Sequence, residues 1–204
     1  MWKLHRKSAL ASIPSRNPVH DLQTEGRTAL ILGASWPIVR RVAITAWVVW
    51  LCDLLSKTVV LHFLEGKSSQ HLLGSFLQLN LTRNSGAAFS FAPGGTVFLT
   101  SFALIVVAVI IFVMGKVKSN WWAITLGLVL GGTLGNLTDR IFRGNPLKGE
   151  VIDWIQLPMW PVFNLADSAI VIAAVFAVVL SFKNISPTSP PTMNDDDKES
   201  HDGA

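Results

Sequence analysis

Hydrophobic and polar positions form long blocks along the chain. Four mostly apolar runs cover about residues 42–63, 96–114, 121–142 and 162–182, and polar segments separate them. A helix rises about 1.5 Å per residue, so a run of about 20 residues crosses the hydrocarbon layer of a bilayer. The pattern therefore predicts an all-α membrane protein with four transmembrane helices.

The polar segment at residues 64–94, between the first two runs, has a different period. Apolar and polar residues alternate over 77–82, which is typical of a half-buried strand, so we expect a small β-element there. Residues 84–90 follow with several small side chains. They let the backbone approach another group closely, although a plain turn would have the same composition.

Both ends of the chain are polar. Residues 1–39 carry prolines and basic residues that resemble the start of a secretion signal, but no apolar region of the required length follows. We interpret them as a flexible cytoplasmic extension. Residues 185–204, rich in Ser, Thr, Pro and Asp, are expected to form a disordered tail, which leaves residues 40–184 as the membrane domain.

The basic residues predict the orientation, because short cytoplasmic loops carry an excess of Lys and Arg. Eleven of the seventeen lie near the chain ends or between the second and third runs: Lys3, Arg6, Lys7, Arg16, Arg27, Arg40, Arg41, Lys116, Lys118, Lys183 and Lys198. Arg83, Arg143 and Lys148 weaken this bias. We expect a multi-pass protein of the cell membrane with both termini cytoplasmic and the 64–94 segment outside.

Composition excludes several classes of protein. The chain is 50% hydrophobic with a mean hydropathy of +0.44, values that favour an integral membrane domain over a soluble one. The net charge of +4 does not indicate nucleic-acid binding, because the basic residues lie mostly outside the apolar runs. Cys52 is the only cysteine, and the five histidines lack metal-ligand spacing. We therefore expect no metal and no other cofactor.

Two aspartates mark the most informative stretch, residues 151–167. Asp153 and Asp167 lie on either side of a Pro-Met-Trp-Pro segment, and Asp167 falls about one helical turn inside the fourth run. A carboxyl group at that depth costs about 2–3 kcal/mol to insert, and more if it is charged and unpaired. Function is the leading explanation for such a cost.

A second acidic position lies within the first run. Asp53 and Lys57 are four residues apart, on one helical face, which favours an ion pair. The alternative, a nucleophilic dyad of Ser56 and Lys57, is disfavoured because adjacent helical residues point about 100° apart and Asp53 already pairs with the ammonium group.

The third run carries two stripes of small or polar residues. Gly127, Gly131 and Gly135 recur every four residues, a spacing that permits close helix packing. A neighbouring stripe leads to the outer end and consists of Gly132, Asn136 and Arg140. Arg140 could simply extend to the interface, but its position one turn from Asn136 favours a polar face turned toward the bundle.

Most of the polar residues named above are expected to gather at the outer end of the helix bundle, where a hydrolytic site would have access to water. Two close carboxyl groups cannot both ionise cheaply, so they share a proton, as in aspartic peptidases. Asp153 and Asp167 are our candidates. Asp139 is a third, but its neighbour Arg140 favours a charge-paired, structural role. The alternatives are a small proton-coupled carrier that uses Asp53, Asp153 and Asp167, and a non-catalytic scaffold that binds lipid or a partner.

Five motifs, taken together in this order, resemble the lipoprotein signal peptidase family, also called signal peptidase II. They begin at Asp53, Asn84, Gly131, Val151 and Phe163 and read Asp-x-x-Ser-Lys, Asn-Ser-Gly-Ala-Ala-Phe-Ser, Gly-Gly-Thr-Leu-Gly-Asn-Leu-Thr-Asp-Arg, Val-Ile-Asp and Phe-Asn-Leu-Ala-Asp. The resemblance covers about residues 40–182. It implies a four-helix membrane aspartic endopeptidase. We expect it to be monomeric and in contact with membrane lipid. Its substrate would be a diacylglyceryl-modified prolipoprotein, cleaved just before the lipidated cysteine.

The resemblance also implies roles for individual residues. Asp153 and Asp167 match the catalytic pair, whereas Asp53 and Lys57 match a pair that looks structural. Positions that line the substrate site or support the pair correspond to Asn84, Gly86, Gly132, Asn136, Arg140, Asn164 and Ala166. The family's outer β-cradle would correspond to the 64–94 segment, and the loop before Asp153 to a gating element.

Overall fold

The computed structural model describes residues 18–86, 95–144 and 147–188, with side chains from residue 36 onward. The chain divides into two compact units, residues 1–34 and 35–204, and every candidate site residue lies in the second. In chain order the elements are α1 (Pro18–Leu64), β1 (Gln70–Leu73), β2 (Leu77–Asn84), α2 (Gly95–Met114), α3 (Asn120–Phe142), β3 (Val151–Gln156) and α4 (Leu165–Phe182).

Three helical segments are long and apolar enough to cross a membrane: Trp36–Leu64 of α1, Gly95–Met114 and Leu165–Phe182. Many of their large apolar side chains are more than half exposed, among them Trp47, Val59, Phe102, Ile105, Val171 and Val178. An outer surface of this kind suits lipid as the solvent. The polar side chains Asp53 and Lys57 are instead buried inside the bundle.

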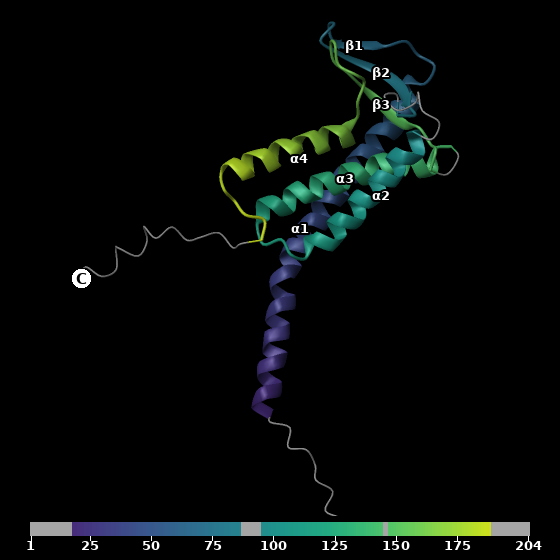
Figure 1. The fold of residues 1–204 in the computed structure, drawn as a ribbon. Helices are drawn as coiled ribbons and strands as arrows, with labels where there is room; N and C mark the ends of the chain where they lie inside the picture. Colours follow the sequence, from purple (N-terminus) through teal and green to yellow (C-terminus); the bar gives the residue numbers. More distant parts are fainter. Residues whose placement is uncertain (1–17, 87–94, 145–146, 189–204) are drawn as a thin grey trace, which may run out of the picture. The chain divides into compact units, whose positions relative to one another are not determined.

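The expected third span is present as α3, a helix of 23 residues, but it is less apolar than the other three. It contacts α2 and α4 and lies between them, as Figure 1 shows. A helix surrounded by other helices can carry polar residues, and α3 carries Asn136, Asp139 and Arg140. The count of four membrane spans stays a prediction.

The glycine stripe of α3 packs closely against α1, as its spacing predicts. A Cβ atom at Gly131 would lie 2.6 Å from the carbonyl oxygen of Ala46, and one at Gly127 would lie 2.5 Å from Cβ of Thr45. At Gly135 it would lie 2.5 Å from Oδ2 of Asp53. Only glycine permits this approach, which brings the polar groups of α1 and α3 together.

The β-element is larger than the sequence predicts. The strand expected over 77–82 lies within β2, but the sheet has three antiparallel strands in the order β1-β2-β3, and β3 comes from residues after α3. Two of the strands, β1 and β2, thus lie between the first two apolar helices as expected, and the third strand, β3, was not predicted. Residues 151–156 lack a clean alternation of apolar and polar side chains, and their pairing with β2 connects distant parts of the chain.

The terminal segments differ in part from the expected boundaries. Helix α1 begins at Pro18, whereas the sequence placed the first span from about 42 and a flexible extension before it. Proline is well suited to a first helical turn, where its missing N–H is not needed. At the other end, the backbone N–H of Lys118 donates to the carbonyl of Pro187 over 2.8 Å. Residues 1–17 and 189–204 lie outside the described residues, and the division into extension, membrane domain and tail stays a prediction.

Candidate active site

The segment between β3 and α4 folds back on itself and brings the two candidate aspartates toward each other. The N–H of Phe163 donates to the carbonyl of Ile155 over 2.9 Å, and the N–H of Ile155 donates back over 2.8 Å. The chain reverses through residues 157–160. Asn164, the next residue after Phe163, therefore lies beside β3 close to Asp153.

Asn164 connects the two aspartates directly. Its side-chain Nδ2 donates to Oδ1 of Asp153 over 2.6 Å, and its backbone N–H donates to Oδ2 of Asp167 over 3.3 Å. Its Oδ1 accepts from the backbone N–H of Asp167 over 2.9 Å, which completes a capping box at the start of α4. A single buried residue thus caps the helix and holds both carboxyl groups, Asp153 with its side chain and Asp167 with its backbone N–H.

Asn84 holds the other oxygen of Asp153 from the end of β2. Its Nδ2 donates to Oδ2 of Asp153 over 2.8 Å, while its Oδ1 accepts from the backbone N–H of Gly86 over 2.8 Å. The bond from Gly86 fixes the orientation of the amide, so that its donor faces Asp153. Gly86 has a φ of 99°, a conformation that favours glycine.

Asn136 of α3 supports Asp167 in the same way. Its Nδ2 donates to Oδ1 of Asp167 over 2.7 Å. Its Oδ1 accepts from Nδ2 of Asn164 over 3.1 Å and from Nζ of Lys57 over 3.2 Å. Each aspartate therefore receives two hydrogen bonds from groups of fixed orientation, and the side chains of the site form one connected network.

Burial raises the pKa of Asp153 to about 6, from a usual value near 4. The hydrogen bonds from Asn84 and Asn164 stabilise the ionised carboxylate and oppose this shift, whereas the charge of Asp167 adds to it. The negative charge of Asp167 thus helps to keep the proton on Asp153.

Gly132 and Ala166 allow α3 to approach the first turn of α4. A Cβ atom at Gly132 would lie 2.5 Å from the carbonyl oxygen of Ala166. Ala166 is itself fully buried. Small residues at both positions therefore bring Asn136 within hydrogen-bonding distance of Asp167.

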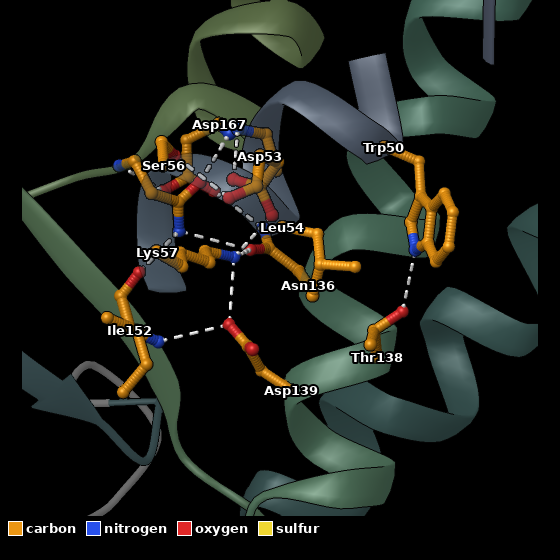
Figure 2. Close-up of polar contacts among 12 residues, drawn as sticks. Trp50, Asp53, Leu54, Ser56, Lys57, Asn136, Thr138, Asp139, Ile152 and Asp167 are labelled. Carbon is orange, nitrogen blue, oxygen red and sulfur yellow. Dashed lines mark hydrogen bonds and ion pairs between the residues drawn. The ribbon is translucent and has the colours of Figure 1, made fainter. Parts of the chain in front are cut away.

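The buried residues Asp53, Lys57 and Asp139 form an ion-pair cluster, which Asn136 connects to Asp167 (Figure 2). Nζ of Lys57 lies 2.7 Å from Oδ2 of Asp53 and 2.8 Å from Oδ2 of Asp139. The ion pair expected from the four-residue spacing is confirmed, and it has a second carboxylate. The hydroxyl of Ser56 donates to the carbonyl of Asp53 over 2.8 Å instead of acting with Lys57.

Asp139 has different partners from the one that the sequence indicated. It pairs with Lys57 and with Nε of Arg143, not with its neighbour Arg140. Arg143 is four residues away on the same helical face, whereas an adjacent residue points about 100° away. Arg140 is partly buried within electrostatic reach of Asp153 and Asp167, and its Nε is a buried atom without a hydrogen-bond partner among the described residues.

The site contains the components for acid–base chemistry at a carbonyl group. Two coupled carboxyl groups are held by amide donors, with a guanidinium group nearby. Within the part of the chain that the structure describes, no three His, Cys, Asp or Glu side chains are arranged to hold a metal ion.

Comparison with known sequences identifies the family. The sequence profile described as signal peptidase (SPase) II matches residues 45–183, which include all the site residues described above. The chain belongs to the signal peptidase II family. It is accordingly a multi-pass membrane protein and an aspartic peptidase.

Relatives of this chain come from Rhodococcus, Streptomyces and Mycobacterium. The lipoprotein signal peptidase of Rhodococcus jostii is 44% identical over 145 residues, which cover 71% of this chain and 73% of that protein. The lipoprotein signal peptidase of Streptomyces coelicolor is 45% identical over 152 residues, with coverage of 72% and 74%. That of Mycobacterium tuberculosis strain H37Rv is 42% identical over 144 residues, with coverage of 70% and 71%.

Solved structures agree with the fold. A bacterial membrane enzyme solved by the in meso method superposes with a TM-score of 0.63 at 25% identity, covering 70% of this chain and 93% of the other. A second structure of the same description has a TM-score of 0.62 at 23% identity, with coverage of 74% and 93%.

Two residues of this signal peptidase II were missed by sequence reasoning. Arg143 pairs with Asp139, and the backbone N–H of Ile152 donates to Oδ2 of Asp139 over 3.2 Å. The spacing of Arg143 from Asp139 was a readable signal, because residues four apart share a helical face. The contact of Ile152 with Asp139 had no signal in the sequence, because it uses a backbone N–H, which almost any residue could supply.

Proposed function

We propose that Asp153 and Asp167 are the catalytic pair of this signal peptidase II. The observation that carries the proposal is the arrangement of Asn164, which donates to a carboxyl oxygen of each. A water molecule held between the carboxyl groups would lose a proton to the ionised one as its oxygen bonds to the scissile carbonyl carbon. The protonated carboxyl donates its proton to the carbonyl oxygen. Collapse of the tetrahedral intermediate then breaks the C–N bond, and the leaving amine takes up a proton.

The surrounding residues take supporting roles in this proposal. The three asparagines at 84, 136 and 164 hold the carboxyl groups in place, and the small residues Gly86, Gly132 and Ala166 permit the close approach of the elements that carry them. Arg140 faces the substrate, because its buried Nε lacks a partner among the described residues. Asp53, Lys57 and Asp139 form the structural base of the site.

The substrates are prolipoproteins that already carry diacylglycerol, and the bond cleaved precedes the lipidated cysteine. The family and the names of the relatives support this assignment. The enzyme works as a monomer in membrane lipid, with four spans that include α3, both termini cytoplasmic and the aspartate pair at the outer leaflet. The distribution of basic residues supports this orientation.

A proton-coupled carrier is less well supported. It would need charged groups distributed through the depth of the bilayer. Asp53, the residue nearest to mid-depth, instead joins Asp139 and Lys57 in a cluster bonded to the aspartate pair. The polar side chains that the structure describes in the bundle thus favour a single hydrolytic site over a proton pathway across the membrane.

The substrate assignment is tested with the purified protein in lipid vesicles. A prolipoprotein carrying diacylglycerol on its lipobox cysteine should be shortened, and the same prolipoprotein without the modification should be cleaved at least about tenfold more slowly, because the acyl chains anchor it in the membrane. Mass spectrometry of the product locates the bond. Equal cleavage of both forms would contradict lipid recognition, and no cleavage of either by a folded protein would favour a carrier or scaffold.

The pH dependence of cleavage follows from the raised pKa of Asp153. We expect kcat/KM to fall as the pH rises through about 6, where Asp153 loses its proton. Because the pKa of Asp153 is raised in the folded state, folding favours its protonated form. Its contribution to the free energy of unfolding is therefore complete below its ordinary pKa and is lost as the pH rises through about 6.

Asn84→Ala removes a bond that stabilises the ionised form. The descending limb of the pH profile should therefore move to higher pH in this variant. Initial cleavage rates at a series of pH values measure the shift. A limb that moves to lower pH would show that the proton lost is not on Asp153.

A further inference from the structure

Lys57 lies at the centre of the contacts below the aspartate pair. Its ammonium group has three hydrogens and three oxygen partners: Oδ2 of Asp53 at 2.7 Å, Oδ2 of Asp139 at 2.8 Å and Oδ1 of Asn136 at 3.2 Å. The side chain is 1% exposed. A lysine buried within a membrane helix is costly, so this arrangement needs an explanation beyond helix packing.

Each carboxylate that Lys57 binds also holds the backbone next to one catalytic aspartate. Oδ1 of Asp53 accepts from the N–H of Ala166 over 3.0 Å, and Ala166 immediately precedes Asp167. Oδ2 of Asp139 accepts from the N–H of Ile152 over 3.2 Å, one residue before Asp153. Lys57 therefore links α4 and β3, the two elements that carry the catalytic pair.

The third contact of Lys57 acts on a side chain of the site. Because Oδ1 of Asn136 accepts from Nζ of Lys57, the amide of Asn136 is oriented with its Nδ2 toward Asp167, to which it donates over 2.7 Å (Figure 2). With the amide reversed, Asn136 would present an oxygen to the carboxylate and a donor to the ammonium group. Lys57 excludes that orientation.

We propose that Lys57 is a positioning residue, which sets the separation of Asp153 and Asp167 through Asp53, Asp139 and Asn136. The inference rests on the proposed catalytic pair. It assigns to Lys57 a role in the chemical step beyond a structural ion pair. A displacement of about 1 Å between reacting groups can cost about 100-fold in rate, so the loss should appear in kcat. Binding of the lipid-modified substrate, and hence KM, depends mainly on other contacts.

The positive charge of Lys57 gives a second readout. The charged groups that act on Asp153 are Asp167 of α4, Lys57 of α1 and Arg140 of α3. Lys57 favours the ionised form of Asp153, so its removal should raise the upper apparent pKa of the pH profile. The change in this pKa reports the charge of Lys57, whereas a fall in kcat at nearly constant KM reports its positioning role. A lysine with only a structural role would not lower kcat in the folded variant.

The experiment compares the kinetics of Lys57→Met and Lys57→Arg in the full-length protein. Lys57→Met should lower kcat about 100-fold, change KM less than about threefold and move the descending limb to higher pH. Lys57→Arg retains the charge, so it should recover at least about a tenth of the wild-type kcat and the wild-type limb. Wild-type kcat and pH profile in Lys57→Met would overturn the proposal.

Thr138→Val is the matched control, because it removes another polar contact between α1 and α3. The indole Nε1 of Trp50 donates to Oγ1 of Thr138 over 3.0 Å, apart from the Lys57 cluster (Figure 2). Wild-type kinetics are expected. Asp153→Asn distinguishes failure of the catalytic assignment from failure of the positioning role. Normal cleavage by Asp153→Asn would show that Asp153 is not catalytic. Normal cleavage by Lys57→Met, with Asp153→Asn inactive, would show that Lys57 has no positioning role.

Asp53→Asn decides the question if Lys57→Met does not fold. This variant keeps an oxygen that can accept from Ala166 and leaves Lys57 paired with Asp139, so buried charge stays compensated. It weakens the hold of Lys57 on α4, and kcat should fall about tenfold with KM nearly unchanged. An unchanged kcat in folded Asp53→Asn would also overturn the proposal.

Discussion

Replacing either Asp153 or Asp167 by asparagine should lower the rate of prolipoprotein cleavage by about 10⁴-fold, the upper range for a general acid–base group. Asparagine has nearly the same shape as aspartate, and it can neither accept the proton of the attacking water nor donate one to the scissile carbonyl. Product formation by the purified variants in lipid vesicles measures the loss.

Glu65→Gln is a matched control for this exchange. Glu65 immediately follows α1, and its exposed side chain pairs with that of Arg83 outside the hydrogen-bond network of the aspartate pair, so the same carboxyl-to-amide change should leave cleavage unaffected. Thermal unfolding of each variant confirms that it is folded. Cleavage within tenfold of the wild-type rate by either Asp→Asn variant would remove that residue from the catalytic pair.

The double variant of Asp153 and Asp167 sharpens the test. Groups that act as one unit in a mechanism are strongly non-additive, so the second substitution should cause little additional loss. If the two losses multiplied, the aspartates would contribute to separate steps and would not share a proton.

Features that depend on local spacing could be predicted from the sequence. The ion pair of Asp53 and Lys57 follows from a separation of four residues on one helix, and the packing of α3 against α1 follows from glycines at every fourth position. Asp167 stood out because a carboxyl group in an apolar run needs compensation, and Asp153 because it lies in the same short stretch. Of the asparagines that hold those carboxyl groups, Asn136 was marked by its polar stripe, whereas the roles of Asn84 and Asn164 came from the family resemblance.

Features that depend on distant parts of the chain could not be predicted in the same way. The pairing of Thr82 with Asp153 joins β2 to β3 across α2 and α3, and nothing within either strand specifies the other. The partner of Asp139 was misassigned because adjacency along the chain was weighed above the direction of side chains on a helix. The hydropathy of α3 is low because its neighbours, and not lipid, surround much of it.

Asn164→Ala should lower kcat by about 10³-fold, the upper range for the loss of one precisely placed donor. The variant loses the side-chain donor to Asp153 and the acceptor that fixes the first turn of α4. The carboxyl group of Asp153 is then held by Asn84 alone and can rotate away from a shared water, whereas Asp167 keeps its bonds from Asn136 and from the backbone N–H of residue 164. Loss of the helix cap should also lower the free energy of unfolding by about 1 kcal/mol.

Asn164→Ser separates these two effects, because serine is as good a helix cap as asparagine but lacks the amide donor. Its thermal stability should be close to that of the wild type, while its kcat should be nearly as low as that of Asn164→Ala. Steady-state cleavage and thermal unfolding of both variants provide the comparison. If serine restored activity together with stability, Asn164 would act only by capping α4. If only stability returned, the bond from Asn164 to Asp153 would itself be required to hold the pair ready for reaction.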